Sequence, residues 1–289
     1  MAKNEMTVTA GSTAMVMDEA MYSMEEESSG IGVDTLGEDD CARVEIKIAQ
    51  QTSPQLKAKN AKYIPGLTQG DLFNSASGKI YGKSVKLAIL GVYKAVVVWS
   101  SLDDISSTPP EEDVMQCVNP KRYAEIINSC AVVDGKRIYK GTKKVNTVYR
   151  LAAVAFDEDG TYEPVMIECA KTRYKNAKQL NTLLTNIRYA DRTGRLHQAP
   201  SCIAMIKMEV AEAGNENNDW FEFKFSRVLE DELLAGGFFK SGLAQSLMSE
   251  ARILRDGLVS GSIVMSGGTE EIDTSDVVFD SADGGEEVF

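Results

Sequence analysis

Residues 146–190, NTVYRLAAVAFDEDGTYEPVMIECAKTRYKNAKQLNTLLTNIRYA, decide the predicted fold. Residues 146–156 and residues 161–169 are apolar runs with many β-branched or aromatic side chains, a composition typical of strands. The residues between them, 157–160 (DEDG), are turn formers. The segment therefore predicts a β-hairpin, and the residues that follow it predict a helix.

That helix, over residues 171–190, is expected to be amphipathic and to carry its cations at its beginning. Four apolar residues have the spacing i, i+3, i+4 and i+7 of one helix face: Leu180, Leu183, Leu184 and Ile187. Four cations precede or enter the first turns: Lys171, Arg173, Lys175 and Lys178. The positive end of a helix dipole disfavours cations by up to about 1 kcal/mol, so we expect an anion such as a phosphate backbone nearby. The alternative is that these cations are solvated on an ordinary surface helix.

Charge is distributed unevenly along the 289 residues, whose formal net charge is −12. Residues 1–40 carry ten acids and one Lys, and residues 261–289 carry eight acids and no base. Residues 41–260 therefore have a net charge of +5, and residues 121–195 one of +7. We predict a disordered acidic N-terminal arm (1–40), a folded body (41–260) and a disordered acidic C-terminal tail (261–289).

The rest of the body predicts further strands and one more helix. Residues 43–48 alternate apolar and polar, and residues 85–99 form a long strand with a bulge or bend at Gly91. Loops and hairpins are expected over 63–82, 100–112 and 132–144, a strand pair over 201–210 and 220–228, and a closing helix over 239–255. In the last strand, Phe221, Phe223 and Phe225 share the face assigned to the core. The predicted class is mainly β with helices (α+β).

Three main strands, a helix and a strand pair form an order that resembles the five-stranded, Greek-key OB barrel with flexible acidic ends, a fold that binds oligonucleotides on one sheet face. Aromatic residues among cations on strands are how single-strand binders stack bases. The candidate nucleic-acid-binding residues are Trp99, Tyr139, Lys140, Lys143, Lys144, Tyr149, Arg150, Lys171, Arg173, Tyr174, Lys175 and Lys178. The alternative for each Tyr taken singly is core packing with a satisfied hydroxyl.

The layout resembles bacteriophage single-stranded-DNA-binding proteins, in which an OB body precedes an acidic tail that ends in an aromatic residue. The chain ends in Glu286, Glu287, Val288 and Phe289. The resemblance implies non-sequence-specific binding and protection of single-stranded DNA in phage replication or recombination. It also implies that these four residues recruit replication or recombination proteins and that the tail competes with DNA. The long acidic N-terminal arm departs from the simplest members of that family.

Several other functions find little support in the sequence. No nucleotide-binding, zinc-protease or serine-hydrolase motif occurs, and His197 is the only histidine, so we expect no enzyme and no cofactor. Three cysteines with His197 would make a zinc set in principle, but their spacing is not that of a finger, so no metal is expected; they are Cys117, Cys130 and Cys202.

The open alternatives are RNA as the ligand, a phage adaptor or strand-annealing protein, and a metal-dependent nuclease using the acids of residues 157–159. No apolar run reaches the ~18 residues of a membrane helix. Five cysteines without CxxC spacing suit reduced thiols. We therefore expect a protein of the host-cell cytoplasm without a membrane partner.

Overall fold

The computed structural model describes residues 44–100, 110–133, 135–170, 173–190, 193–214, 219–228 and 243–260. The described elements are mainly strands with three α-helices, which confirms the α+β class. The strands are β1 Ile46–Ile48, β2 Leu72–Asn74, β3 Ile80–Gly82, β4 Ser84–Trp99, β5 Glu112–Met115, β6 Cys130–Val133, β7 Lys136–Tyr139, β8 Lys143–Phe156, β9 Tyr162–Cys169, β10 Arg188–Ala190, β11 Leu196–Gln198, β12 Met205–Gly214 and β13 Asp219–Arg227. The helices are α1 Pro120–Asn128, α2 Tyr174–Asn186 and α4 Leu243–Ser260, with short 3-10 turns η3 Pro54–Leu56 and η5 Ser201–Ile203. Both predicted acidic ends lie outside the described residues.

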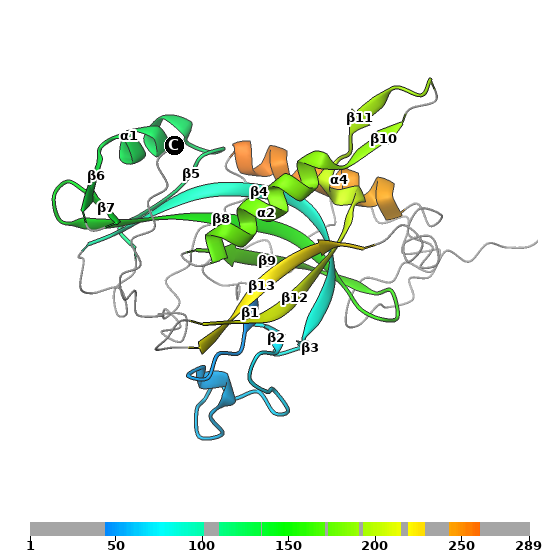
Figure 1. Ribbon diagram of the computed structural model, residues 1–289, viewed down its shortest axis with the longest axis horizontal. Helices are drawn as coiled ribbons and strands as arrows, with labels where there is room; N and C mark the ends of the chain where they lie inside the picture. The colour runs from blue at the N-terminus through cyan, green and yellow to red at the C-terminus, as the bar shows by residue number, and fades with distance from the viewer. Residues whose placement is uncertain are drawn as a thin grey trace, which may run out of the picture.

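Two long antiparallel strands, β4 and β8, form the centre of the molecule, as Figure 1 shows. Their register shifts between Ile89 and Gly91, which confirms the expected bulge at Gly91. The ring of Tyr93 lies over Gly91, so a Cβ at position 91 would meet the Tyr93 side chain, which would have to move. The bulge bends β4 in its middle, so the sheet curves.

Each long strand has two different partners along its outer edge. β12 pairs with residues 84–88 of β4, whereas β5 pairs with residues 95–98. On the other side, β7 pairs with residues 143–145 of β8, and β9 pairs with residues 149–156. The sheet therefore has two halves that share β4 and β8 but carry different flanking strands.

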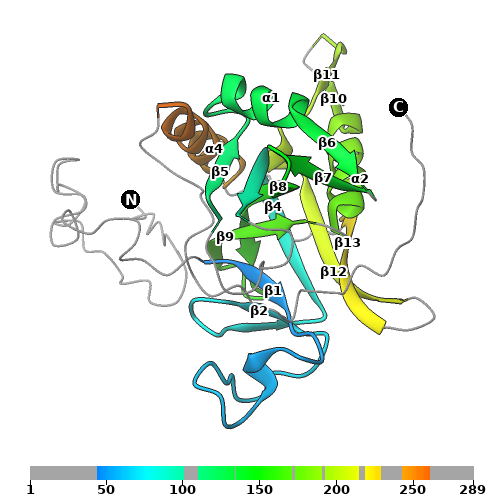
Figure 2. The ribbon, with the colours of Figure 1, turned by 90° about the vertical axis from the view of Figure 1, so that its left-hand side faces the viewer.

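A small sheet of β1, β2 and β3 lies below the main sheet in Figures 1 and 2. A parallel bridge from Glu45 to Met166 joins it to β9. At the opposite side the Gln50 amide donates to the Phe221 carbonyl of β13 (2.8 Å) and accepts from the Phe221 N–H (3.0 Å). These contacts connect two edges of the curved sheet through a side chain rather than through a strand ladder. The described strands thus form open sheets, and the expected five-stranded OB barrel is not confirmed.

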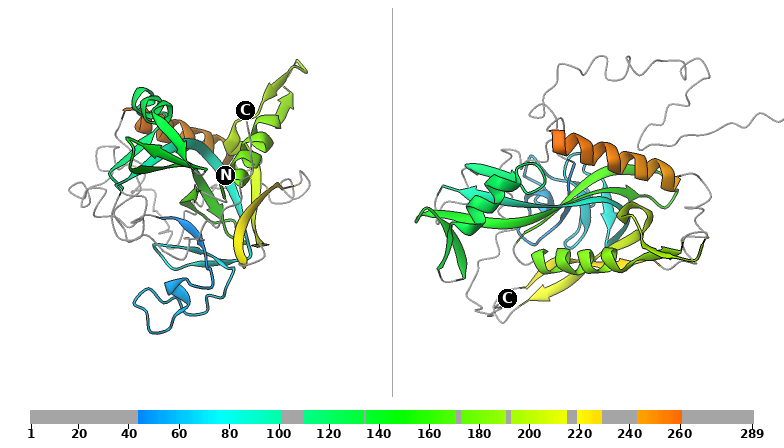
Figure 3. Two further views of the ribbon diagram at one scale, coloured as in Figure 1. Left: turned by 60° about the vertical axis from the view of Figure 1, so that its left-hand side comes forward. Right: turned by 90° about the horizontal axis from the view of Figure 1, so that it is seen from above.

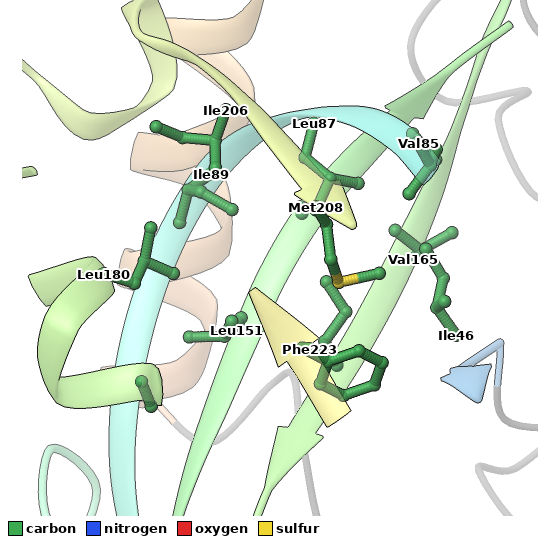
Figure 4. Packing of buried hydrophobic residues seen from close by; sticks show 14 of the residues in the cluster. Ile46, Val85, Leu87, Ile89, Leu151, Val165, Leu180, Ile206, Met208 and Phe223 are labelled. Atoms are coloured by element: carbon green, nitrogen blue, oxygen red, sulfur yellow. The ribbon is translucent and has the colours of Figure 1, made fainter. Parts of the chain in front are cut away.

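The main core fills the space between the curved sheet, the small sheet and α2, as Figure 4 shows. Leu151 of β8, Leu180 of α2 and Phe223 of β13 are fully buried in it. Each such side chain stabilises the fold by about 1.5–3 kcal/mol relative to exposure. Phe223 confirms the core face assigned to β13, and Leu180 confirms the apolar stripe of the helix.

The three helices cover different parts of the sheet. α2 packs on the face that contains the main core, and α4 packs on the opposite face, around Leu247 and Leu258; the right-hand view of Figure 3 shows them on either side of the long strands. α1 covers the far end of the sheet through Tyr123 and Ile126.

One predicted helix had the wrong limits, and another helix was not predicted. The helix expected over 171–190 ends at Asn186, and Arg188–Ala190 instead forms β10, which pairs with β11. The helix α1 was not predicted, although Asn119 caps it and Pro120 occupies its first position. These differences matter because β10 begins directly after α2, the helix that contributes Asn181 to the candidate site.

Candidate nucleic-acid interface

An open groove lies between α2 and the segment that leads into α1; it is here called the α1–α2 groove and has a volume of about 440 Å³. Its lining comes from the middle of β4, the loop after β5, β8 and α2. The lining residues are Val92, Tyr93, Lys94, Gln116, Cys117, Tyr149 and Asn181. The groove reaches the edge of β4 between its pairings with β12 and β5, so it is bounded by strand ends as well as helices.

Two tyrosines border this groove as a stacked pair. The Tyr149 ring on β8 lies 4.7 Å from the Tyr174 ring at the start of α2, at an interplanar angle of 28°. Burial, together with a hydrogen bond to Tyr149, raises the pKa of the Tyr174 phenol, so the Tyr174 hydroxyl is neutral at pH 7. Lys178 Nζ lies 5.4 Å from the Tyr174 ring centroid, within cation–π range. The pair is a preformed aromatic surface with a cation beside it.

Cations surround the groove on several elements. Lys94 lies in its floor and is half-buried, and Arg137 of β7 donates to the Thr147 hydroxyl of β8 (2.8 Å). Lys175 and Lys178 are exposed on α2, a helix that contains no Asp or Glu. This arrangement favours a negatively charged ligand along α2.

The structure brings Tyr149, Tyr174, Lys175 and Lys178 of the predicted residues together at this groove and beside it. Four contributors were missed: Lys94, Arg137, Gln116 and Asn181. Lys94 had a weak signal, because it is a cation within the most apolar strand of the chain. The positions of Gln116 and Asn181 depend on how β5 and α2 pack, which no local pattern shows.

Arg150 does not belong to this surface. Its side chain is 1% exposed, and its guanidinium forms a two-bond pair with Asp113 of β5 (2.8 and 2.6 Å) and a bond to Glu168 of β9 (3.0 Å). Although burial opposes it, these carboxylates raise the pKa of Arg150. Arg150 is a buried residue that forms ion pairs with two carboxylates. Its prediction as a DNA contact was therefore wrong.

Tyr139 is also in the interior, with 2% of its surface exposed. It packs under α1, with Arg122 and Lys140 over its ring at 5.8 and 5.0 Å. Lys140 itself is in the left-handed region (φ 50°) before Gly141, in the tight turn that joins β7 to β8. Tyr139 therefore stabilises the far end of the sheet and does not offer a stacking surface.

The remaining candidates lie away from the groove or are engaged elsewhere. Trp99 is half-buried in the cluster under α4, and its indole N–H has no hydrogen-bond partner among the described residues. Arg173 lies over the Phe223 ring (4.8 Å), Lys143 pairs with Glu111, and Lys144 is half-buried opposite Trp99. Lys171 and the tail residues Glu286, Glu287, Val288 and Phe289 lie outside the described residues.

The acids once considered for a metal-dependent nuclease form the expected turn. Asp157 pairs with Lys79 (2.6 Å) and accepts from the Thr161 hydroxyl (3.0 Å), while Asp159 accepts from the same hydroxyl (2.7 Å). Lys79 also pairs with Glu163 (2.8 Å), so this group fastens the small sheet to the β8–β9 hairpin. Within the ranges that the structure describes, no group of three His, Cys, Asp or Glu is placed to hold a metal ion.

Comparison with known proteins gives one match. No curated protein and no solved structure matches the chain. Among the described helices, none has the length and apolar character needed to cross a membrane. The model of the family described as Pam3 phage gp34-like protein matches residues 10–234, which is more than three quarters of the chain and includes α1, α2 and the groove between them. The chain therefore belongs to the Pam3 phage gp34-like family of phage proteins.

Proposed function

We propose that this phage protein binds single-stranded DNA with little sequence preference and acts without catalysis in phage replication or recombination, in the host cytoplasm. The observation that carries the proposal is the stacked Tyr149–Tyr174 pair beside the α1–α2 groove, with Lys178 over one ring. The two rings are half-buried, and an aromatic surface next to cations suits any base, because every base has a π face; each stacked base contributes about 1–3 kcal/mol.

In the proposed binding mode, the bases of the strand contact aromatic rings and its phosphates contact cations. A volume of about 440 Å³ lies within the range of about 300–1,000 Å³ that encloses small ligands, so the groove would hold a short piece of the strand. The bases would stack beside Tyr149 and Tyr174, and the phosphates would follow Lys94, Lys175 and Lys178. The strand outside the groove would then cross the acid-free surface of α2.

The proposal has two further parts. Partner recruitment involves tail residues outside the described ranges, and the OB barrel is still a prediction. Recruitment of replication or recombination proteins by Glu286, Glu287, Val288 and Phe289 is proposed from the sequence alone. The OB barrel likewise stays a prediction, and the binding mode does not depend on it. The proposed binding mode needs only a curved sheet with stacking residues on one face, a property that OB folds share.

The test is a substitution that removes the ring of Tyr174 but keeps apolar bulk. Tyr174→Leu should weaken binding of a labelled oligo-dT by about 1–3 kcal/mol, whereas Tyr174→Phe should stay close to the native affinity because it keeps the stack. Tyr63→Leu, at a tyrosine 40% exposed on the loop before β2, is the matched control. Melting temperatures recorded beside the titrations separate lost stacking from lost folding.

The same titrations distinguish the other candidate functions. If native protein does not bind oligo-dT at low salt, the proposal is wrong. Tighter binding of an RNA of matched length and sequence would indicate that the ligand is RNA rather than DNA. Strand annealing without saturable binding would favour the annealing or adaptor function, and Mg²⁺-dependent cleavage would favour a nuclease.

A further inference from the structure

A two-stranded hairpin, β10–β11, stands away from the rest of the sheet in Figure 1. Its three residue pairs join Arg188 to Gln198, Tyr189 to His197 and Ala190 to Leu196, and neither strand pairs with any other described strand. An isolated ribbon of this kind is only marginally stable by itself. Its position therefore has to be set by the residues at its base.

That base is firmly attached. Ile187 and Ala199, on either side of the hairpin, are buried in the main core, and the Ala199 N–H donates to the Ile187 carbonyl (2.9 Å). Arg188 also donates to the last-turn carbonyl of Thr185 in α2. The hairpin is thus a projecting arm fixed to the C-terminal end of α2, while the Tyr149–Tyr174 pair lies at the N-terminal end.

The described surface of this arm combines cations with one exposed apolar side chain. Arg188 and Arg195 are exposed, and Leu196 is 68% exposed. In sequence, residues 188–198 carry three arginines and one acid, Asp191, so the arm has a net positive charge. An apolar residue of that size so far out on a thin ribbon does not contribute to the core. Arginines beside an apolar wedge on a narrow arm are the combination with which proteins enter a groove of duplex DNA and part a base step.

The helix α2 runs from the groove to the arm. α2 has 13 residues, so it spans about 20 Å, or the axial length of about six phosphates on one strand. Its exposed side chains along this path are polar or cationic: Lys175, Lys178, Gln179, Thr182 and Thr185. A nucleic acid can therefore extend from the stacked tyrosines to the arm without meeting an acid of α2.

We infer that the β10–β11 arm contacts double-stranded DNA, so that the protein prefers a junction where single-stranded DNA meets a duplex. This inference rests on the proposed single-strand binding at the Tyr149–Tyr174 pair and adds a second contact of a different kind. The single strand lies in the α1–α2 groove, and the duplex begins at the far end of α2, with Arg195 at phosphates and Leu196 at a base step.

The experiment compares the full chain with two double variants on three DNAs: oligo-dT, a blunt duplex, and a duplex with a single-stranded overhang. Arg195→Gln/Leu196→Ala changes the arm. Arg252→Gln/Ile253→Ala is the matched control, an exposed Arg and apolar pair on α4, on the opposite face of the sheet. Affinities are measured by fluorescence anisotropy, and the folding of both variants is checked by their melting temperatures.

We expect the native chain to bind the junction about tenfold more tightly than oligo-dT. The arm variant should lose that gain and keep its oligo-dT affinity, and the control should keep both. The inference is overturned if the native chain has no junction preference, or if the arm variant loses junction and oligo-dT binding equally. A changed oligomeric state with unchanged DNA binding would also overturn it and make the arm a protein contact. Absence of all oligo-dT binding would instead remove the proposed function itself.

Discussion

At the residue scale, Arg150 shows why a cation in a basic segment need not contact an anion in solution. It lies in the middle of β8, where Tyr93 of β4 and Glu168 of β9 are its register partners. In sequence it differs little from Lys144 or Lys178, and a charge count includes all three alike. Only the pairing of β5 with β4 brings Asp113 to it, because Asp113 is far from Arg150 along the chain.

The ion pairs of Arg150 give a prediction for stability. Arg150→Met removes the guanidinium that pairs with the Asp113 carboxylate, whose side chain is 9% exposed, so the free energy of unfolding should fall by about 3–5 kcal/mol. Urea denaturation measures this loss, and Arg150→Met/Asp113→Leu should recover part of it because the buried charge is removed. If Arg150→Met lowers the oligo-dT affinity and leaves the stability unchanged, Arg150 contacts DNA after all.

At the scale of elements, the sequence predicts what depends on local pattern. β4, β8, β9, β12 and β13 follow from apolar runs between turn residues, and Gly91 marks the bulge in β4. β5, with the sequence EDVM, has no such pattern; it is a strand because it pairs with the buried end of β4. The groove likewise could not be predicted, since Lys94, Gln116 and Tyr149 meet only after three separate segments have packed.

The helix α2 is the element in which the sequence argument and the structure agree best. It begins at Tyr174, its buried side faces the core, and its exposed side carries cations without acids. If those cations neutralise phosphates, the affinity for DNA must fall as the salt concentration rises. For single strands the logarithm of the affinity falls with the logarithm of salt concentration by about 0.7 per phosphate neutralised.

Lys178→Gln should therefore reduce that slope by about 0.7 and weaken binding most at low salt. Its Nζ lies beside the Tyr174 ring, so some loss should persist at high salt through the missing cation–π contact. Oligo-dT titrations at four or more salt concentrations give the slope, with Lys57→Gln, an exposed lysine near the small sheet, as the matched control. Equal slopes for all three proteins would show that α2 does not contact the backbone.

At the scale of the whole molecule, the body of the chain carries a net positive charge and both ends carry a net negative charge. The net charge is −12, yet residues 41–260 carry +5, and the described groove and α2 are on the basic side of that division. Residues 261–289 carry eight acids and no base, and they are joined to the body directly after α4. A tethered anionic segment acts on a cationic site at an effective concentration set by the length of its tether.

Removing residues 261–289 should therefore tighten oligo-dT binding, because the proposed competitor is lost, and the gain should shrink as salt screens both contacts. A full-length variant with the eight acids of the tail changed to Asn or Gln is the control, since it keeps the tether and removes only the charge. If the neutralised tail gives the same gain as the deletion, competition is electrostatic; if neither variant gains affinity, the tail does not reach the groove. Binding of replication proteins with and without Phe289 tests recruitment separately, because losing one residue at the end leaves the charge of the tail nearly unchanged.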